Sequence, residues 1–104
     1  MSYINQGGVM SNDGFKHYAV EFLMLNSKYY NHEFPLSIES DALSFVKNTS
    51  DFRHKDVVSA GVLTNTLVQL GYIEYFKKEN NVRLYILTEK GRDFVNKANE
   101  LKQR

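Results

Sequence analysis

The stretch LVQLGYIEYFKKENNVRLYILTEKG, residues 67–91, decides the fold. It opens on the apolar spacing of a helix, and Gly71 then stands where a left-handed residue commonly ends one. After this glycine, residues 72–77 and 82–87 show the alternation and the aromatic and β-branched composition of β-strands. The residues between them, Glu-Asn-Asn at 79–81, belong to turns, because asparagine tolerates positive φ. The stretch therefore predicts the end of a helix followed by a β-hairpin.

The end of the same stretch predicts a final helix. Thr88 is a good N-cap, and Glu89 is favourable in the positively polarised first turn. Apolar side chains then recur at helical spacing, at Phe94, Ala98 and Leu101. Gly91 would let this helix pack closely on the hairpin, whose inward face would carry Tyr85 and Leu87.

Three helices are predicted upstream of the hairpin. The first begins at Ser11 or Asn12, and its apolar stripe consists of Phe15, Tyr18, Ala19, Phe22, Leu25 and Tyr29. Pro35 breaks it, and residues 36–38 then alternate as a short strand. A second, short helix starts near residue 40. The third runs from about 56 to 70, and its core face carries Ala60, Leu63, Leu67 and Leu70.

The predicted order is helix, strand, helix, helix, strand, strand, helix, which is an α+β fold that is mainly α. Two helices followed directly by a hairpin is the arrangement of a winged helix-turn-helix. A chain of 104 residues suits a single domain. We assign that domain to residues 11–104 and expect residues 1–10, which contain two adjacent glycines, to form a flexible arm.

Two segments of the chain resemble a known group of proteins. LVQLGYI at 67–73 is similar to the end of the recognition helix in MarR-like and PadR-like transcriptional regulators. RLYILTEKG at 83–91 resembles the junction of wing and last helix in the same families. The resemblance covers about residues 40–100. It implies a winged helix fold and a function in binding double-stranded DNA to regulate transcription.

The charge distribution agrees with a polyanionic partner for the second half of the chain. The formal net charge is +1 overall, but residues 1–50 carry −2 and residues 51–104 carry +3. Local charge decides whether a surface attracts phosphate, because salt screens exposed charges beyond about 10 Å. Nucleic acid would therefore bind through the second half.

The third helix is expected to enter the major groove. Opposite its core face lie Val58, Gly61, Val62, Asn65 and Gln69, flanked by Ser59, Thr64 and Thr66. Amides can bond an adenine edge, hydroxyls can bond base or phosphate, and valine can contact a thymine methyl. The predicted base-contacting residues are Ser59, Val62, Asn65, Thr66 and Gln69. The predicted phosphate-contacting residues are Arg53 and Lys55 before the helix and Lys77, Lys78 and Arg83 on the wing.

Four alternatives stay open at this point. No Lys or Arg lies between Asp56 and Phe76, so the third helix could instead bind a protein. Asn65 and Gln69 could simply be solvated, and the wing cations could merely protect a sheet edge. The apolar first helix predicts a homodimer, although it could also fold onto its own hairpin.

Other functions find no support in the sequence. The chain has no cysteine, its three histidines lack zinc-site spacing, and no phosphate-binding glycine loop is present. No metal, cofactor or enzymatic activity is therefore expected. Because no apolar run approaches the roughly 20 residues that span a bilayer, and residues 1–10 do not resemble a signal peptide, we expect a cytoplasmic protein without membrane contact.

Overall fold

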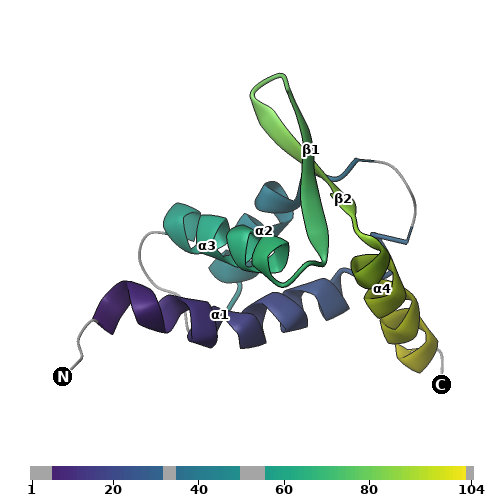
Figure 1. The fold of residues 1–104 in the computed structure, drawn as a ribbon, viewed down its shortest axis with the longest axis horizontal. Helices are drawn as coiled ribbons and strands as arrows, with labels where there is room; N and C mark the ends of the chain where they lie inside the picture. Colours follow the sequence, from purple (N-terminus) through teal and green to yellow (C-terminus); the bar gives the residue numbers. More distant parts are fainter. Residues whose placement is uncertain (1–5, 32–34, 50–55, 103–104) are drawn as a thin grey trace.

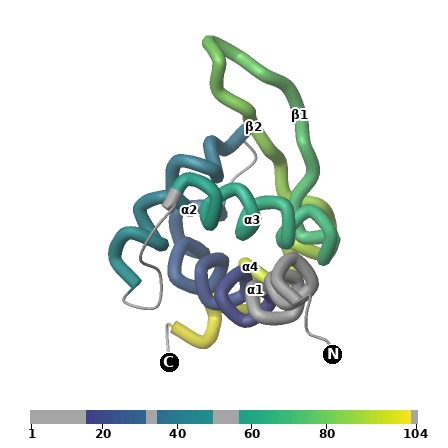
Figure 2. Tube along the Cα trace, turned by 90° about the vertical axis from the view of Figure 1, so that its left-hand side faces the viewer, coloured from purple at the N-terminus to yellow at the C-terminus, as the bar shows by residue number. Residues whose placement is uncertain are grey.

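The computed structural model describes residues 6–31, 35–49 and 56–102. Within these segments the chain is an α+β structure, mainly helical, with a two-stranded antiparallel sheet. In chain order the elements are α1 (Gln6–Leu25), α2 (Ile38–Lys47), α3 (Asp56–Gln69), β1 (Ile73–Glu79), β2 (Val82–Leu87) and α4 (Glu89–Lys102). Helix α1 runs along one side of α2 and α3, and the hairpin projects away from the helices on the other side (Figure 1). Figure 2, turned by 90°, shows the same projection of β1 and β2.

The segment before α2 differs from the prediction. Leu36 and Tyr85 form an isolated antiparallel bridge, with two backbone hydrogen bonds of 2.7 and 2.8 Å. The ladder stops there because Ile38 is already the first residue of α2. The predicted strand at 36–38 is therefore wrong, and the described elements follow the order helix, helix, helix, strand, strand, helix. The bridge still ties the start of α2 to the hairpin.

The start of α1 also differs from the prediction. The helix begins at Gln6, ahead of the N-cap expected at Ser11 or Asn12, so residues 6–10 of the expected arm are helical. Extending an existing helix fixes one residue for each hydrogen bond gained, which is far easier than starting a new one. Residues 1–5 of the expected arm lie outside the described residues.

The hairpin has the predicted turn and one unpredicted irregularity. Asn80 and Asn81 both have positive φ, 53° and 65°, as a two-residue type I′ turn requires. The register then shifts between Tyr75 and Lys77, which is a β-bulge at the intervening residue. Between the bulge and the turn, Lys78 pairs directly with Arg83 across the hairpin.

The junction of α3 and β1 is the predicted glycine cap. Gly71 has a φ of 86°, and its N–H donates to the carbonyl of Val68 at 3.0 Å. The N–H of Tyr72 donates to the carbonyl of Leu67 at 3.1 Å. These two bonds form a Schellman motif, which satisfies the last carbonyls of the helix and turns the chain into β1.

The junction of β2 and α4 also has the predicted form. The Thr88 hydroxyl oxygen accepts the N–H of Gly91 at 3.1 Å, and the same hydroxyl donates to the carbonyl of Gly71. A Cβ on Gly91 would lie 1.9 Å from the carbonyl oxygen of Tyr72. The start of α4 can therefore approach the start of β1 this closely only because residue 91 is glycine.

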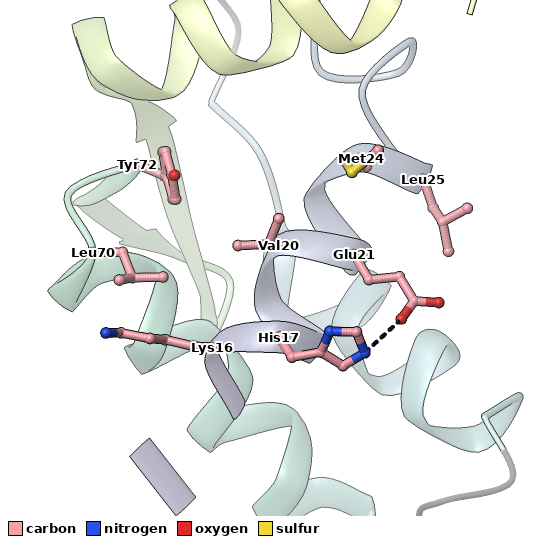
Figure 3. A pocket seen from close by; sticks show the side chains of 8 residues that line it. All are labelled: Lys16, His17, Val20, Glu21, Met24, Leu25, Leu70 and Tyr72. Carbon is pink, nitrogen blue, oxygen red and sulfur yellow. Dashed lines mark ion pairs between the residues drawn. The ribbon is translucent and has the colours of Figure 1, made fainter. Parts of the chain in front are cut away.

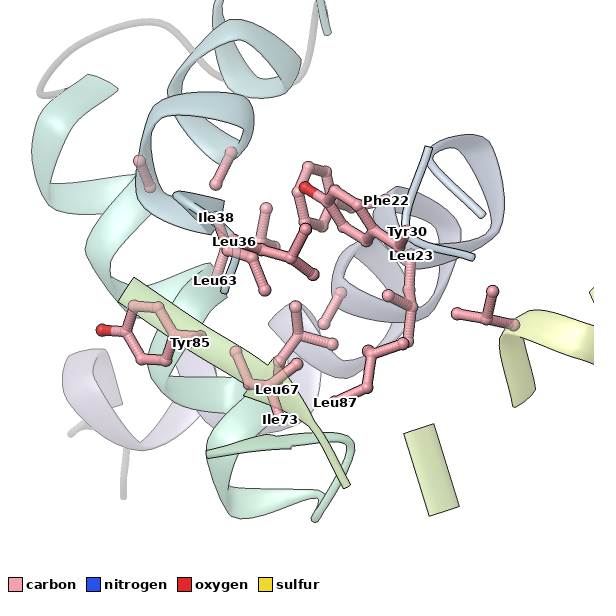
Figure 4. Packing of buried hydrophobic residues seen from close by; sticks show 14 of the residues in the cluster. Phe22, Leu23, Tyr30, Leu36, Ile38, Leu63, Leu67, Ile73, Tyr85 and Leu87 are labelled. Carbon is pink, nitrogen blue, oxygen red and sulfur yellow. The ribbon is translucent and has the colours of Figure 1, made fainter. Parts of the chain in front are cut away.

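The core lies where α1, α2, α3 and the inner hairpin face meet (Figure 4). Ala60, Leu63 and Leu67 of α3 are buried as predicted, and Leu70 is partly buried. On the hairpin, Tyr85 and Leu87 face inward as expected. The remaining large buried side chains include Phe22, Leu23, Tyr30, Leu36, Ile38 and Ile73.

The predicted apolar stripes of α1 and α4 are only partly correct. Leu23 of α1 is fully buried, whereas Leu25 is 55% exposed and Tyr29 is 60% exposed. The buried face is rotated because α1 packs against both α3 and α4. On α4, Val95 is buried while Leu101 is 64% exposed, so the buried row is Gly91, Val95 and Ala98.

Candidate nucleic-acid interface

The exposed side of α3 is uncharged. Val58 is 59% exposed, Asn65 and Gln69 are exposed, and Gly61 and Val62 are half-buried; we call this set the α3 face. Its residues share one side of the helix because α2 and α1 cover the others. Amide donors and acceptors thus lie beside valine methyl groups. Such a combined surface can contact the edges of base pairs, and it can also contact an apolar surface of another protein.

Two of the predicted base-contacting residues are less accessible than expected. Thr66 is 3% exposed, and its hydroxyl donates to the carbonyl of Val62 at 2.7 Å. The prediction that Thr66 contacts DNA is therefore wrong. Its hydroxyl is bonded to a backbone carbonyl of its own helix and cannot reach outward. Ser59 is half-buried. Thr64, expected on a flank, is fully buried and bonds to the carbonyl of Ala60 at 2.9 Å.

The hairpin carries the predicted cations, and two of them already have acidic partners. The ammonium of Lys77 lies 3.2 Å from the carboxylate of Glu79 and 5.8 Å from the ring centroid of Phe76. Lys78 is exposed and, within the part of the chain that the structure describes, forms no ion pair. Because Lys78 stands opposite Arg83, two positive charges are held across one rung of the ladder, an arrangement that favours an anionic partner.

Arg83, in the second pair from the turn of the hairpin, is bound by a residue of α2. Its guanidinium donates to the carboxylate of Glu39 at 3.1 Å, and the hydroxyl of Tyr85 donates to the same oxygen at 3.2 Å. The hydrogen bond to Glu39 raises the pKa of Arg83. Burial, followed by the charge of Glu39, raises the pKa of Tyr85. Exposed ion pairs of this kind contribute little to stability, so Arg83 can exchange Glu39 for another anion.

A groove runs between α2, α3 and the side chain of Arg83 on the hairpin. It has a volume of about 480 Å³, and its lining consists of Glu39, Ser40, Leu43, Val57, Ala60, Gly61 and Arg83. Val57 at its edge is 72% exposed. The groove therefore joins the α3 face to the Glu39–Arg83 pair.

A second groove lies along α1, and we call it the α1 groove. It has a volume of about 580 Å³, and its apolar lining consists of Val20, Met24, Leu25, Leu70 and Tyr72. Figure 3 shows these side chains with Lys16, His17 and Glu21, the last two of which form an ion pair of 3.7 Å. Met24 is 41% exposed. Both exposed large apolar side chains that are described in α1, Met24 and Leu25, line this groove.

Some predicted residues cannot be placed, and some placed residues were not predicted. Arg53 and Lys55 lie outside the described residues. Glu39 and Val57 were missed as parts of this surface. Val57 could have been found because it lies four residues, about one helical turn, before Gly61. Glu39 could not, because no local signal connects it to Arg83, which is 44 positions away.

The chain matches no protein-family model, no curated protein and no solved structure. Among the helices described, none has both the length and the apolar character needed to cross a membrane.

Proposed function

We propose that this protein binds double-stranded DNA as a small, cytoplasmic winged helix-turn-helix regulator of transcription. In this proposal α3 enters the major groove and the hairpin is the wing that follows the phosphate backbone. The contacts to DNA come from Asn65, Gln69, Val62 and Ser59 on α3 and from Lys77, Lys78 and Arg83 on the wing. Arg53 and Lys55, which precede α3 in the sequence, remain in the proposal as phosphate contacts.

The observation that carries the proposal is the arrangement of α2, α3 and the hairpin. Helix α3 packs on α2, ends in the Schellman motif at Gly71, and continues directly into a hairpin that projects from the helices (Figure 1). A helix whose exposed side carries amides thus stands next to a projecting hairpin with Lys78 opposite Arg83. A major-groove helix needs base-bonding side chains, and its flanking element needs cations for phosphate.

A protein-interaction module is the second candidate, and one observation favours it. Between Val57 and Gly71 the chain has no charged residue, and three valines of α3 are exposed: Val57 at 72%, Val58 at 59% and Val68 at 38%. Such a surface also fits an apolar groove on another protein. The two candidates differ in salt dependence, because only phosphate binding releases condensed counterions.

The proposal is tested by titrating the purified protein into fluorescent duplex DNA at several salt concentrations. Each phosphate contact adds about 0.9 to the slope of log affinity against log salt. Replacing Lys77 and Lys78 by glutamine is expected to lower the slope by about 1.8. Glu39→Gln should act in the opposite direction and strengthen binding, because Arg83 then contacts phosphate without giving up its ion pair with Glu39.

The matched control removes the same amount of charge elsewhere. Lys28→Gln combined with Lys97→Gln changes exposed lysines in the turn after α1 and on α4. This variant is expected to keep the slope of the unchanged protein. Absence of duplex binding at low salt, or equal effects of the two lysine pairs, would contradict the proposal and favour the interaction module.

We further propose that two copies of the protein pair through the α1 groove. Burying the exposed side chains of Met24 and Leu25 against a second copy would remove apolar surface from water, which drives most protein association. Sedimentation of the intact chain should detect a dimer, and Met24→Glu combined with Leu25→Glu should shift it to the monomer. An intact chain that sediments as a monomer at every concentration would refute the pairing.

A further inference from the structure

The α3 face offers a restricted set of chemical groups. In α3 the described side chains carry no charge, and the exposed polar groups are the amides of Asn65 and Gln69. These two residues are four positions apart and therefore lie one above the other on the same side of the helix. Val58 extends this row toward the start of α3 with exposed methyl groups. The face combines hydrogen-bonding amides with apolar methyls and has no cation.

These groups match one kind of base pair in the major groove. The side-chain amide of Asn or Gln bonds N6 and N7 of adenine with two hydrogen bonds, and an apolar side chain contacts the C5-methyl of thymine. Guanine is read mainly by Arg or Lys, which bond O6 and N7. Because α3 presents the first two groups and lacks the third, its chemistry is complementary to A·T pairs.

Gly61 adds an independent observation at the same place. It is the residue one turn before Asn65, and apart from the backbone of its own helix no atom of the described residues lies within 4 Å of the position that its Cβ would take. Its φ lies outside the left-handed region, so the helix does not need a glycine there. Glycine inside a helix costs stability relative to alanine. The fold alone therefore gives no reason for this residue, whereas a partner that approaches the backbone closely does.

We infer that α3 selects A·T base pairs in the major groove, with Asn65 and Gln69 bonding adenine and Gly61 letting the duplex approach the helix backbone. This inference rests on the proposed function. From Val58 to Gln69 the helix extends over roughly 16 Å at 1.5 Å per residue. That length spans about five base pairs at 3.4 Å each. The preferred site is thus a short A·T run, and the wing cations hold the flanking phosphates.

The test begins with selection of duplexes from a random library by the full-length protein, which is expected to enrich a run of A·T pairs. Inosine·cytosine pairs are then placed in that run. They present the major-groove edge of G·C but the minor-groove pattern of A·T, because inosine lacks the N2 amino group. If α3 reads the major groove, this change should weaken binding by about tenfold. Uracil in place of thymine, which removes only the methyl, should weaken it less.

Two variants locate the selectivity on α3. Asn65→Ala should bring the affinities for the A·T and inosine·cytosine duplexes close together, whereas Asn96→Ala, an exposed asparagine of α4, should leave them apart. Gly61→Ala should raise the thermal midpoint by about 4 °C through helix propensity while weakening A·T binding. Loss of affinity together with a gain of stability separates a contact with DNA from a folding defect.

The outcomes distinguish this inference from the proposed function. Salt-dependent binding without enrichment of A·T pairs, or with unchanged affinity for the inosine duplex, would overturn the inference and leave DNA binding standing. Unchanged affinity of the Gly61→Ala variant would overturn the close approach at the helix backbone. Absence of binding to every duplex would overturn both proposals.

Discussion

Replacing Gly91 by alanine is expected to lower the free energy of unfolding by about 3 kcal/mol. The added Cβ would lie 1.9 Å from the carbonyl oxygen of Tyr72 and 2.8 Å from its carbonyl carbon, distances that no native contact permits. Neither atom can rotate away, because both belong to the backbone. The same oxygen accepts the N–H of Thr88 at 3.0 Å, so any shift also breaks the hydrogen bond that joins the residue before β1 to the residue before α4.

Urea unfolding followed by circular dichroism measures this effect, and a second glycine supplies the control. Gly61→Ala introduces the same methyl group into a helix where, apart from its own backbone, no atom of the described residues lies within 4 Å. It is expected to raise stability by about 1 kcal/mol. Opposite signs for the two variants would separate steric conflict from helix propensity. Equal stabilities of the Gly91→Ala variant and the unchanged protein would refute the close packing of α4 on β1.

Raising the pH above 10 is expected to destabilise the protein through Tyr30. The side chain is 2% exposed, and its hydroxyl donates to the carboxylate of Asp41 at 2.5 Å. Burial, followed by the hydrogen bond to Asp41, raises the pKa of Tyr30 far above the ordinary value of 10.0. Because the folded-state pKa exceeds the unfolded-state pKa, the stability from Tyr30 is complete below pH 10. It is lost as the pH rises above 10 toward the folded-state value, by about 1.4 kcal/mol for each pH unit.

Tyr30→Phe tests this contribution directly. At pH 7 the variant should be less stable by about 2 kcal/mol, because it loses a hydrogen bond to a charged group. Above pH 10 its stability should fall less steeply than that of the unchanged protein. Tyr29→Phe changes the neighbouring tyrosine, which is 60% exposed, and should follow the unchanged protein at both pH values. Parallel curves for Tyr30→Phe and the unchanged protein above pH 10 would refute the assignment.

The elements that the sequence predicted best are those whose contacts are local. The Gly71 cap depends on hydrogen bonds to Val68 and Leu67, and the turn depends on the φ values of its two asparagines. Both arise within a few residues of the chain, so residue type and spacing are sufficient to predict them. The close approach at Gly91 was also predicted, because a residue without a side chain lets a helix pack closely on the hairpin beside it.

The candidate interface was predicted less completely, because accessibility depends on distant segments. A projection of α3 set Asn65, Gln69 and Thr66 on or beside one face, yet the packing of α1 and α2 buries Thr66 and leaves both amides exposed. Spacing along a helix predicts the directions of its side chains relative to one another. It does not predict how much of the helix surface the neighbouring helices cover. The phosphate role predicted for Arg83 likewise took no account of Glu39, which reaches it from α2.

The sequence by itself determined the hairpin, its turn, the two glycine positions that join it to α3 and α4, and the absence of charged residues from Val57 to Gly71. The tertiary structure alone decided that residues 36–38 form a single bridge instead of a strand, since α2 begins at Ile38 and leaves no further residue to pair. It also decided which side of α1 is buried and that Arg83 bonds Glu39. The physical reason is the same in each case: local geometry follows from φ preferences and nearby hydrogen bonds, whereas burial and ion pairing depend on which distant segments the folded chain brings into contact.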